Sequence, residues 1–196
     1  EKVAIMNALS SPTGSQSLLN RVSPSDKICI LFTDITRATP NHKIIPWILE
    51  HLKDHPKENI ILLNQLGTHR PNTKEELEKM LTPEVVAQYN VINHEPENED
   101  ALIEVGQTYD GTPALINKHA VNADLRIVTG FIEPHFFAGF SGGPKGIMPG
   151  VAGLRTVMSN HGYKNIGNPQ STFGVTFGNP LWEELRSIAL KTGPSF

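Results

Sequence analysis

The sequence has few of the features that define several large protein classes. It contains one cysteine, Cys29, which excludes a disulfide framework and a zinc site built on several thiolates. No apolar run approaches the roughly 18 residues of a membrane span, and no basic-then-apolar leader opens the chain. Positive charge is not in excess, because 17 lysines and arginines stand against 20 aspartates and glutamates. These absences predict a soluble, cytoplasmic, reduced chain that binds neither nucleic acid nor membrane.

Length and composition indicate an ordinary folded domain. The 196 residues are 38% hydrophobic, which is enough for a buried core without disulfides or a structural metal. The chain begins at Glu1, and its last residues follow a predicted helix. We therefore expect residues 1–196 to be a single domain cut from a longer protein, with part of an active site lying in the remainder.

Short apolar runs alternate with helical patterns along the chain. The runs of strand length are residues 27–32, 59–64, 91–93 and 125–130. The helical patterns are residues 44–52, 73–80, a short one after Pro83, 115–123, 149–162 and 180–192. This alternation predicts an α/β fold, namely a Rossmann-like three-layer domain with a mainly parallel sheet. The acidic stretch of residues 94–104 is expected to be solvated surface.

Ligand sites in such folds lie where loops leave the carboxyl ends of the strands. Three segments occupy such positions: Asp34-Ile35-Thr36-Arg37, Gly67-Thr68-His69-Arg70 and the chain after Gly130. Arg37 and Arg70 carry forked donors suited to a carboxylate or phosphate, although a lone arginine is usually a surface residue. Asp34 has three possible roles: to orient the arginine, to bind a ribose hydroxyl or to cap a helix.

Residues 130–153 hold seven of the 16 glycines of the chain. Within them, Ser141-Gly142-Gly143-Pro144-Lys145-Gly146 suggests a cradle of backbone N–H groups for an anion, with Lys145 reaching in. The segment is not a Walker A loop, because no serine or threonine follows the lysine, and it does not match the dinucleotide fingerprint. A structural Ω-loop is the alternative.

Eight histidines are present, and three of them follow predicted strands or the glycine-rich segment. His69, His135 and His161 could be metal ligands or general acids and bases, or they could be structural. The other five are predicted to lie on helices or polar surface without a functional role: His42, His51, His55, His94 and His119.

Taken in order, these motifs resemble the nickel-dependent lactate racemase family. The resemblance covers nearly the whole chain and the amino-terminal domain of the family only; the carboxyl-terminal domain is absent. It implies a cofactor-binding domain of an isomerase, a lactate-type 2-hydroxy acid racemase or epimerase working by reversible hydride transfer through a 2-keto acid. The implied cofactors are nickel and pyridinium-3,5-bisthiocarboxylic acid mononucleotide, the nickel-pincer nucleotide, which separate maturation proteins supply. The chain alone is expected to be inactive.

The resemblance also implies a role for individual residues. Lys145 matches the lysine that tethers the cofactor through a thioamide, and His161 matches the nickel ligand. His69 and His135 match two histidines of equivalent function that serve as the acid–base pair. Arg37 matches the arginine that engages the substrate carboxylate.

Five further residues fall where the cofactor contacts of the family lie: Asp34, Thr36, Ser141, Gly142 and Gly143. Two other functions stay open beside the racemase. One is a non-catalytic phosphate- or nucleotide-binding module. The other is a zinc-dependent hydrolase using His69, His135 and His161, which lacks a helical H-E-x-x-H motif.

Overall fold

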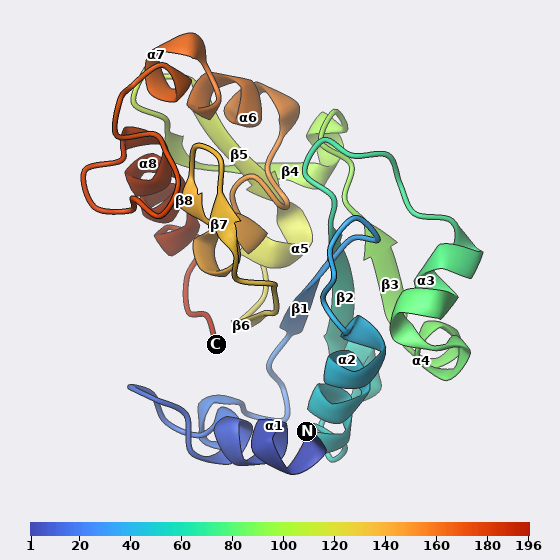
Figure 1. The fold of residues 1–196 in the computed structure, drawn as a ribbon. Helices are drawn as coiled ribbons and strands as arrows, with labels where there is room; N and C mark the ends of the chain where they lie inside the picture. The colour runs from blue at the N-terminus through green and yellow to red at the C-terminus, as the bar shows by residue number, and fades with distance from the viewer.

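A four-stranded parallel sheet lies at the centre of the computed structural model, which describes residues 1–196 (Figure 1). Its strands are β1 (Ile28–Thr33), β2 (Ile60–Gln65), β3 (Asn90–Asn93) and β6 (Leu125–Val128). They lie in the order β3-β2-β1-β6. The sequence predicted all four strands and their parallel arrangement. Because β2 and β6 flank β1 on opposite sides, the strand order reverses there, and such a reversal opens a crevice at the carboxyl ends of the strands.

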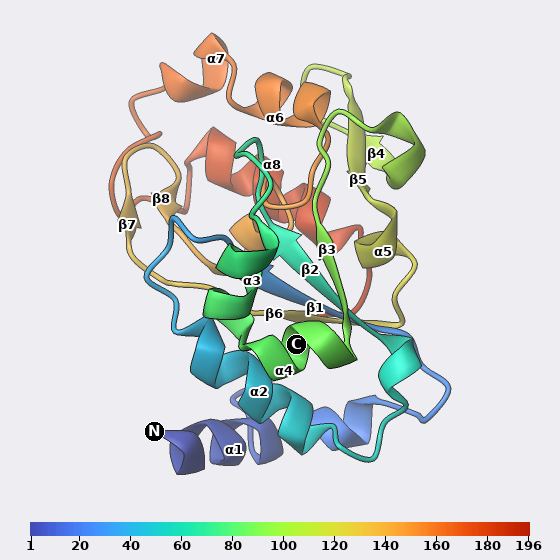
Figure 2. The ribbon, with the colours of Figure 1, turned by 90° about the vertical axis from the view of Figure 1, so that its right-hand side faces the viewer.

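Helices cover both faces of the sheet, as the three-layer prediction required (Figure 2). One layer contains α1 (Lys2–Ser10), α2 (Asn41–His51), α3 (Lys74–Leu81) and α4 (Pro83–Gln88). The other contains α5 (Lys118–Val121), α6 (Leu154–Asn160) and α8 (Pro180–Leu190). The alternation along β1 explains the two cores. Ile28, Ile30 and Phe32 pack in the first core, whereas Cys29 and Leu31 pack in the second.

The remaining elements are short. Two antiparallel hairpins join β4 (Leu102–Gln107) to β5 (Pro113–Asn117) and β7 (Pro134–His135) to β8 (Gly139–Phe140). Single turns of helix are α7 (Tyr163–Ile166), η1 (Leu18–Arg21), η2 (Lys57–Asn59), η3 (Glu99–Ala101) and η4 (Gly143–Gly146). None of the helices has the length and the apolar composition that a membrane span requires.

Three predictions about local structure were wrong. Residues 115–117, expected in a helix, belong to β5, and only Lys118–Val121 is helical. The helix expected over 149–162 covers Leu154–Asn160, because residues 149–153 form turns that close the glycine-rich segment. The acidic stretch is only partly solvated surface, since β4 begins at Leu102.

Two histidines assigned to helices or polar surface are buried. His94 is 1% exposed, and its Nε2 lies 2.9 Å from the Ala152 carbonyl oxygen. Asn117 Nδ2 lies 3.2 Å from the other ring nitrogen of His94. His55 is 9% exposed and its Nε2 lies 2.9 Å from the Asp26 carbonyl oxygen. Both rings are structural, and tertiary packing, which the local sequence does not report, placed them inside.

Candidate functional site

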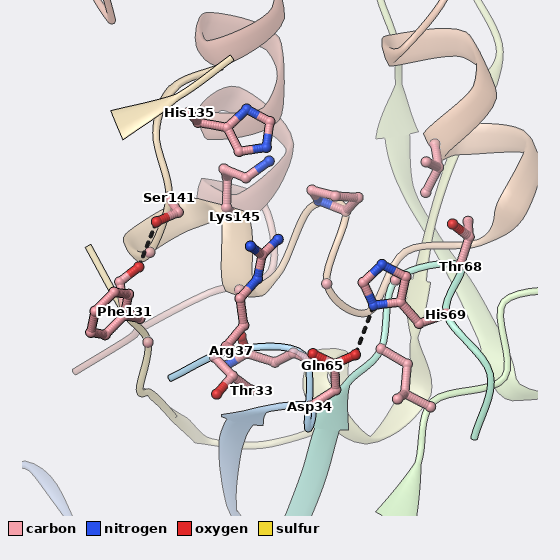
Figure 3. A pocket seen from close by; sticks show the side chains of 18 of the residues that line it. Thr33, Asp34, Arg37, Gln65, Thr68, His69, Phe131, His135, Ser141 and Lys145 are labelled. Atoms are coloured by element: carbon pink, nitrogen blue, oxygen red, sulfur yellow. Dashed lines mark hydrogen bonds and ion pairs between the residues drawn. The ribbon is translucent and has the colours of Figure 1, made fainter. Parts of the chain in front are cut away.

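A cavity of about 240 Å³ opens at the carboxyl ends of β1, β2 and β6 (Figure 3). Its walls come from the loops after these strands, the β7–β8 hairpin, η4 and the end of α6. All five residues to which the resemblance assigned an individual role line it: Arg37, His69, His135, Lys145 and His161. Groups separated by more than a hundred residues in sequence therefore face one space, as the crevice at a strand-order reversal requires.

The Lys145 side chain points into the cavity from the 3₁₀ turn η4 (Figure 3). The first hydrogen bond of this turn runs from the Lys145 N–H to the Gly142 carbonyl. None of the ion pairs of the chain involves its amine. Burial, and then the positive charge of Arg37, lower the pKa of Lys145 to about 8. Near neutral pH a larger fraction of this amine is therefore uncharged than of a free lysine, and the uncharged amine is the nucleophilic form.

Residues 141–150, called the anchor loop below, are packed too tightly to accept side chains at two glycines. A Cβ on Gly150 would collide with the Gly146 carbonyl, and one on Gly146 would lie 2.7 Å from Val128 Cγ1. The loop is also tied to the segment that follows β2, because the Gly67 N–H donates to the Gly150 carbonyl at 2.8 Å. The glycines permit a close backbone approach, and the anchor loop holds Lys145 in a fixed place.

His69 is held by the carboxylate at the end of β1. Its Nδ1 lies 2.7 Å from Asp34 Oδ2, and the Asp34 side chain is only 4% exposed whereas that of His69 is 49% exposed. Asp34 also accepts a hydrogen bond from Thr36 Oγ1 at 2.7 Å. Asp34 thus orients a histidine and not an arginine, and its predicted binding of a ribose hydroxyl stays a prediction. It does not cap a helix, since α2 begins at Asn41.

His135 occupies the opposite wall and is engaged differently. Its Nδ1 accepts backbone N–H groups from Ala138 at 3.2 Å and from Phe137 at 3.5 Å. Burial, and then the positive charges of Lys145 and Arg37, lower the pKa of His135 to about 4. The ring is therefore neutral over the physiological pH range.

His161 directly follows α6 and shares a neighbour with His135. The Phe137 ring packs edge-on against both imidazoles, with centroids 4.7 Å from His135 and 5.3 Å from His161. Nδ1 of His161 is buried without a hydrogen-bond partner. Burial and the Lys145 charge lower the pKa of His161 to about 4. A neutral imidazole that lines a cavity is a competent metal ligand.

Arg37 lies between the lysine and the His69 side of the cavity (Figure 3). Its side chain is 37% exposed, and its only carboxylate partner is Glu133 at 3.5 Å. An ion pair of this length between exposed side chains is weak. The guanidinium is thus free to bind an anion entering the cavity.

The predicted cofactor contacts are placed unequally. Asp34, Ser141 and Gly142 line the cavity, whereas Thr36 and Gly143 do not. The Ser141 hydroxyl is already used, because it donates to the Phe131 carbonyl and accepts from the Glu133 N–H. Ser141 therefore braces the loop that carries the β7–β8 hairpin.

Two residues of the site were missed by sequence reasoning. Gln65 ends β2, lines the cavity and donates from Nε2 to the Thr129 carbonyl at 2.9 Å, which joins the loops after β2 and β6. The sequence did carry a signal for Gln65, namely a polar residue at the end of a buried strand. Phe137 had no signal, because its contact with His161 depends on the folding of a distant segment.

Together these features describe an α/β domain that presents a lysine, an arginine and three histidines at the carboxyl ends of its strands, where the strand order reverses. The lactate racemase N-terminal domain family model matches residues 1–174, and the chain belongs to this family. It is 36% identical over 186 residues to the lactate racemase of Lactiplantibacillus plantarum, covering 94% of the chain and 44% of that protein. It is 34% identical over 197 residues to the lactate racemase of Thermoanaerobacterium thermosaccharolyticum, covering 100% of the chain and 46% of that protein.

Solved structures agree with this assignment. The lactate racemase apoprotein of T. thermosaccharolyticum superposes with a TM-score of 0.93 at 32% identity, covering 98% of the chain and 46% of that structure. A protein of Thermotoga maritima superposes with a TM-score of 0.78 at 25% identity, covering 97% and 47%. The chain thus spans less than half the length of the relatives it matches.

Proposed function

We propose that this chain is the cofactor-binding domain of a 2-hydroxy acid racemase or epimerase that uses nickel and the nickel-pincer nucleotide. The observation that carries the proposal is the position of Lys145. An amine with a lowered pKa shares one cavity with an arginine and three histidines. Family membership supports a racemase, and the lactate racemases named above support a lactate-type substrate.

The donor set of the cavity fits such a cofactor. No group of three His, Cys, Asp or Glu side chains is placed to hold a metal ion. The cavity is nevertheless lined by one imidazole that is neutral near pH 7, His161, beside an amine able to form a covalent bond. A metal held there needs most of its ligands from a bound organic group, and sulfur arms on a tethered ring meet that need for nickel.

The chain's own residues have distinct tasks in this proposal. Lys145 holds the cofactor covalently and His161 ligates nickel. Arg37 binds the substrate carboxylate, while His69 and His135 flank the hydroxyl-bearing carbon. When bound, the cofactor supplies the acceptor for the hydride that leaves this carbon. Removing hydrogen as hydride avoids a dianion, which loss of a proton beside a carboxylate would create.

The two alternative functions have less support. A zinc hydrolase needs about three protein ligands converging on one point, and His69, His135 and His161 share the cavity without forming such a group. A module that merely binds an anion has no use for a buried amine whose pKa is lowered, because a fully charged lysine binds anions better.

The rest of a longer protein is a further partner in this proposal. Large apolar side chains on and beside the β7–β8 hairpin are exposed: Phe131, which lines the cavity, Ile132, Phe136 and Phe173, whose ring packs edge-on against that of Phe136. Such a patch marks an interaction site. We expect the carboxyl-terminal half found in the longer relatives to cover it and to complete the substrate pocket.

Intact mass spectrometry tests the tether. After co-production with maturation proteins and nickel, the wild-type protein should carry a cofactor-sized adduct and the Lys145→Ala protein should not. Replacement of the exposed Lys53 by alanine is the matched control and should retain the adduct. His161→Ala should keep the adduct and lose stoichiometric nickel. An adduct that persists on Lys145→Ala would contradict the proposal.

A further inference from the structure

The arginine proposed to bind the substrate carboxylate already faces a carboxylate of the protein. Arg37 lies in the loop after β1, and Glu133 directly precedes the β7–β8 hairpin. The two side chains meet at a single point, where Arg37 Nη1 lies 3.5 Å from Glu133 Oε1. Neither side chain makes another hydrogen bond or ion pair, and they are 37% and 43% exposed.

The backbones on both sides of this contact are fixed. The Arg37 N–H donates to the Asp34 carbonyl at 3.2 Å, which closes a turn after β1. Glu133 is joined twice to the anchor loop, because its N–H donates to Ser141 Oγ at 3.0 Å and its carbonyl accepts from the Ser141 N–H at 2.9 Å. The Glu133 carboxylate is therefore kept near the guanidinium, although the two groups do not form the short, paired bonds of a strong arginine–carboxylate contact.

Most of the donors of Arg37 are unused in this arrangement. A guanidinium carries five N–H groups, and only one nitrogen of Arg37 is engaged. A ligand carboxylate can form two short parallel bonds to the same guanidinium, so it displaces the long contact with Glu133. The bound ligand then lies close to a second negative charge, and this repulsion lowers its affinity.

We propose that Glu133 is a competing counter-ion, which weakens the binding of a ligand carboxylate to Arg37 and thereby sets the affinity of the cavity for its 2-hydroxy acid. The inference rests on the proposed function and adds a residue that acts through Arg37 without touching the substrate. The substrate carboxylate carries the same charge in the bound substrate and in the transition state. Glu133 therefore acts on KM and leaves kcat nearly unaffected.

Anion binding to the cofactor-free full-length protein tests the competition directly. The ¹H–¹⁵N signal of the Arg37 Nε–H group, identified by its loss in Arg37→Lys, should shift as sodium L-lactate replaces sodium chloride at constant ionic strength. Glu133→Gln should lower the lactate dissociation constant about two- to fivefold, the effect of one exposed ion pair.

Glu50→Gln is the matched control for this measurement. Glu50 pairs with Lys2 at a similar exposure, near the end of α2 and away from the cavity. Its replacement removes the same charge and also breaks an exposed ion pair, so the lactate dissociation constant should stay at the wild-type value.

The direction of the change separates competition from a structural role. A distorted site binds its ligand more weakly, whereas removal of a competitor makes binding tighter. If Glu133 instead held the guanidinium in position for the ligand, Glu133→Gln would raise the lactate dissociation constant. A raised constant would overturn the inference, and so would an unchanged one.

Kinetics of the loaded full-length protein give a second measurement. In Glu133→Gln the KM for lactate should fall about two- to fivefold, while kcat stays within about twofold of wild type. A loss in kcat without a change in KM would contradict the proposed role. A loaded wild-type protein without racemase activity would overturn the proposed function, but it would leave the lactate-binding result as it is, so the two fail separately.

Discussion

Three side chains in the cavity have pKa values below those of the same groups in water. Lys145 loses its proton more easily than a free lysine, and His135 and His161 gain theirs less easily. Burial is the leading cause in each case, and mutual repulsion among the positive groups adds to it. The cavity therefore favours neutral nitrogen atoms, which are the forms that bind metals and attack electrophiles.

The lowered pKa of Lys145 predicts unusual reactivity. Since an amine reacts only when uncharged, the rate of acylation at Lys145 by a small anhydride should rise with pH and reach half of its maximum at about pH 8. Free lysine, with a pKa near 10.4, should still be rising steeply there. Peptide-level mass spectrometry across pH 6–11 measures both. A midpoint for Lys145 near 10.4 would show that burial does not depress its pKa.

The contact between Asp34 and His69 predicts a loss of rate without a loss of cofactor. In Asp34→Asn the amide cannot stabilise a positive imidazole, so turnover of the loaded full-length protein should fall about 10²- to 10⁴-fold. Intact mass should still show the adduct. Thr36→Val removes only the hydrogen bond from Thr36 to Asp34 and should change turnover less than tenfold. An Asp34→Asn enzyme with near-normal turnover would mean that this carboxylate does not support the base.

At the scale of secondary-structure elements, α8 supports the site from behind. Its N-cap residue, Asn179, is fully buried and accepts from the N–H groups of Leu181 and Trp182. The same side chain donates to the carbonyl of Phe137 in the hairpin turn that holds His135. Further along α8, the buried Glu184 accepts from Asn160, the residue before His161. One helix thus positions two of the three cavity histidines.

Removal of the Asn179 side chain should be costly. Asn179→Ala deletes a helix cap and leaves buried backbone groups unpaired, which predicts a loss of roughly 2–4 kcal/mol in the free energy of unfolding. Urea denaturation measures it. Thr73→Ala is the comparison, because Thr73 caps α3 at an exposed position and its loss should cost only about 1 kcal/mol. Equal losses would show that the link from Asn179 to the hairpin adds nothing.

Elements that depend on local pattern were predictable and those that depend on distant partners were not. The continuous apolar runs of β1 and β2 identified buried parallel strands because neither face of the sheet is solvated. β5 was misread as helix, since a short apolar run does not distinguish the two and its partner β4 had not been recognised. For the site, the motifs located the lysine, the arginine and three histidines. They could not reveal that His69 faces a carboxylate, whereas His135 faces two backbone N–H groups.

Over the whole molecule, one buried and three partly buried imidazoles couple folding to pH. Burial lowers the pKa of His94, and the pKa values of His119, His135 and His161 are lowered as well. An unfolded chain, with histidine pKa values near 6.5, binds more protons than the folded one below that pH. Stability should therefore be greatest above about pH 6.5 and should fall as the solution is acidified toward pH 5.

His94 should contribute a clear share of this fall. The free energy of unfolding, measured in urea at pH 7.5 and pH 5, should decrease with acid by up to about 1.4 kcal/mol per pH unit for each such histidine. His94→Gln keeps a polar side chain beside Ala152 and Asn117 but has no group to titrate, so its decrease should be smaller. A pH dependence identical to that of wild type would show that His94 takes up no proton on unfolding.

The tight anchor loop has a consequence for how such a protein acquires a large ligand. The backbone packs closely at Gly146 and Gly150, and the Gly67 N–H holds the loop by a hydrogen bond to Gly150. The backbone around Lys145 is therefore ordered before any ligand binds. An incoming molecule then loses little affinity to the entropy of arranging its receptor. The same rigidity makes the loop sensitive to substitution. A methyl group added at either of these two glycines would displace Lys145 and prevent the cofactor from attaching to it.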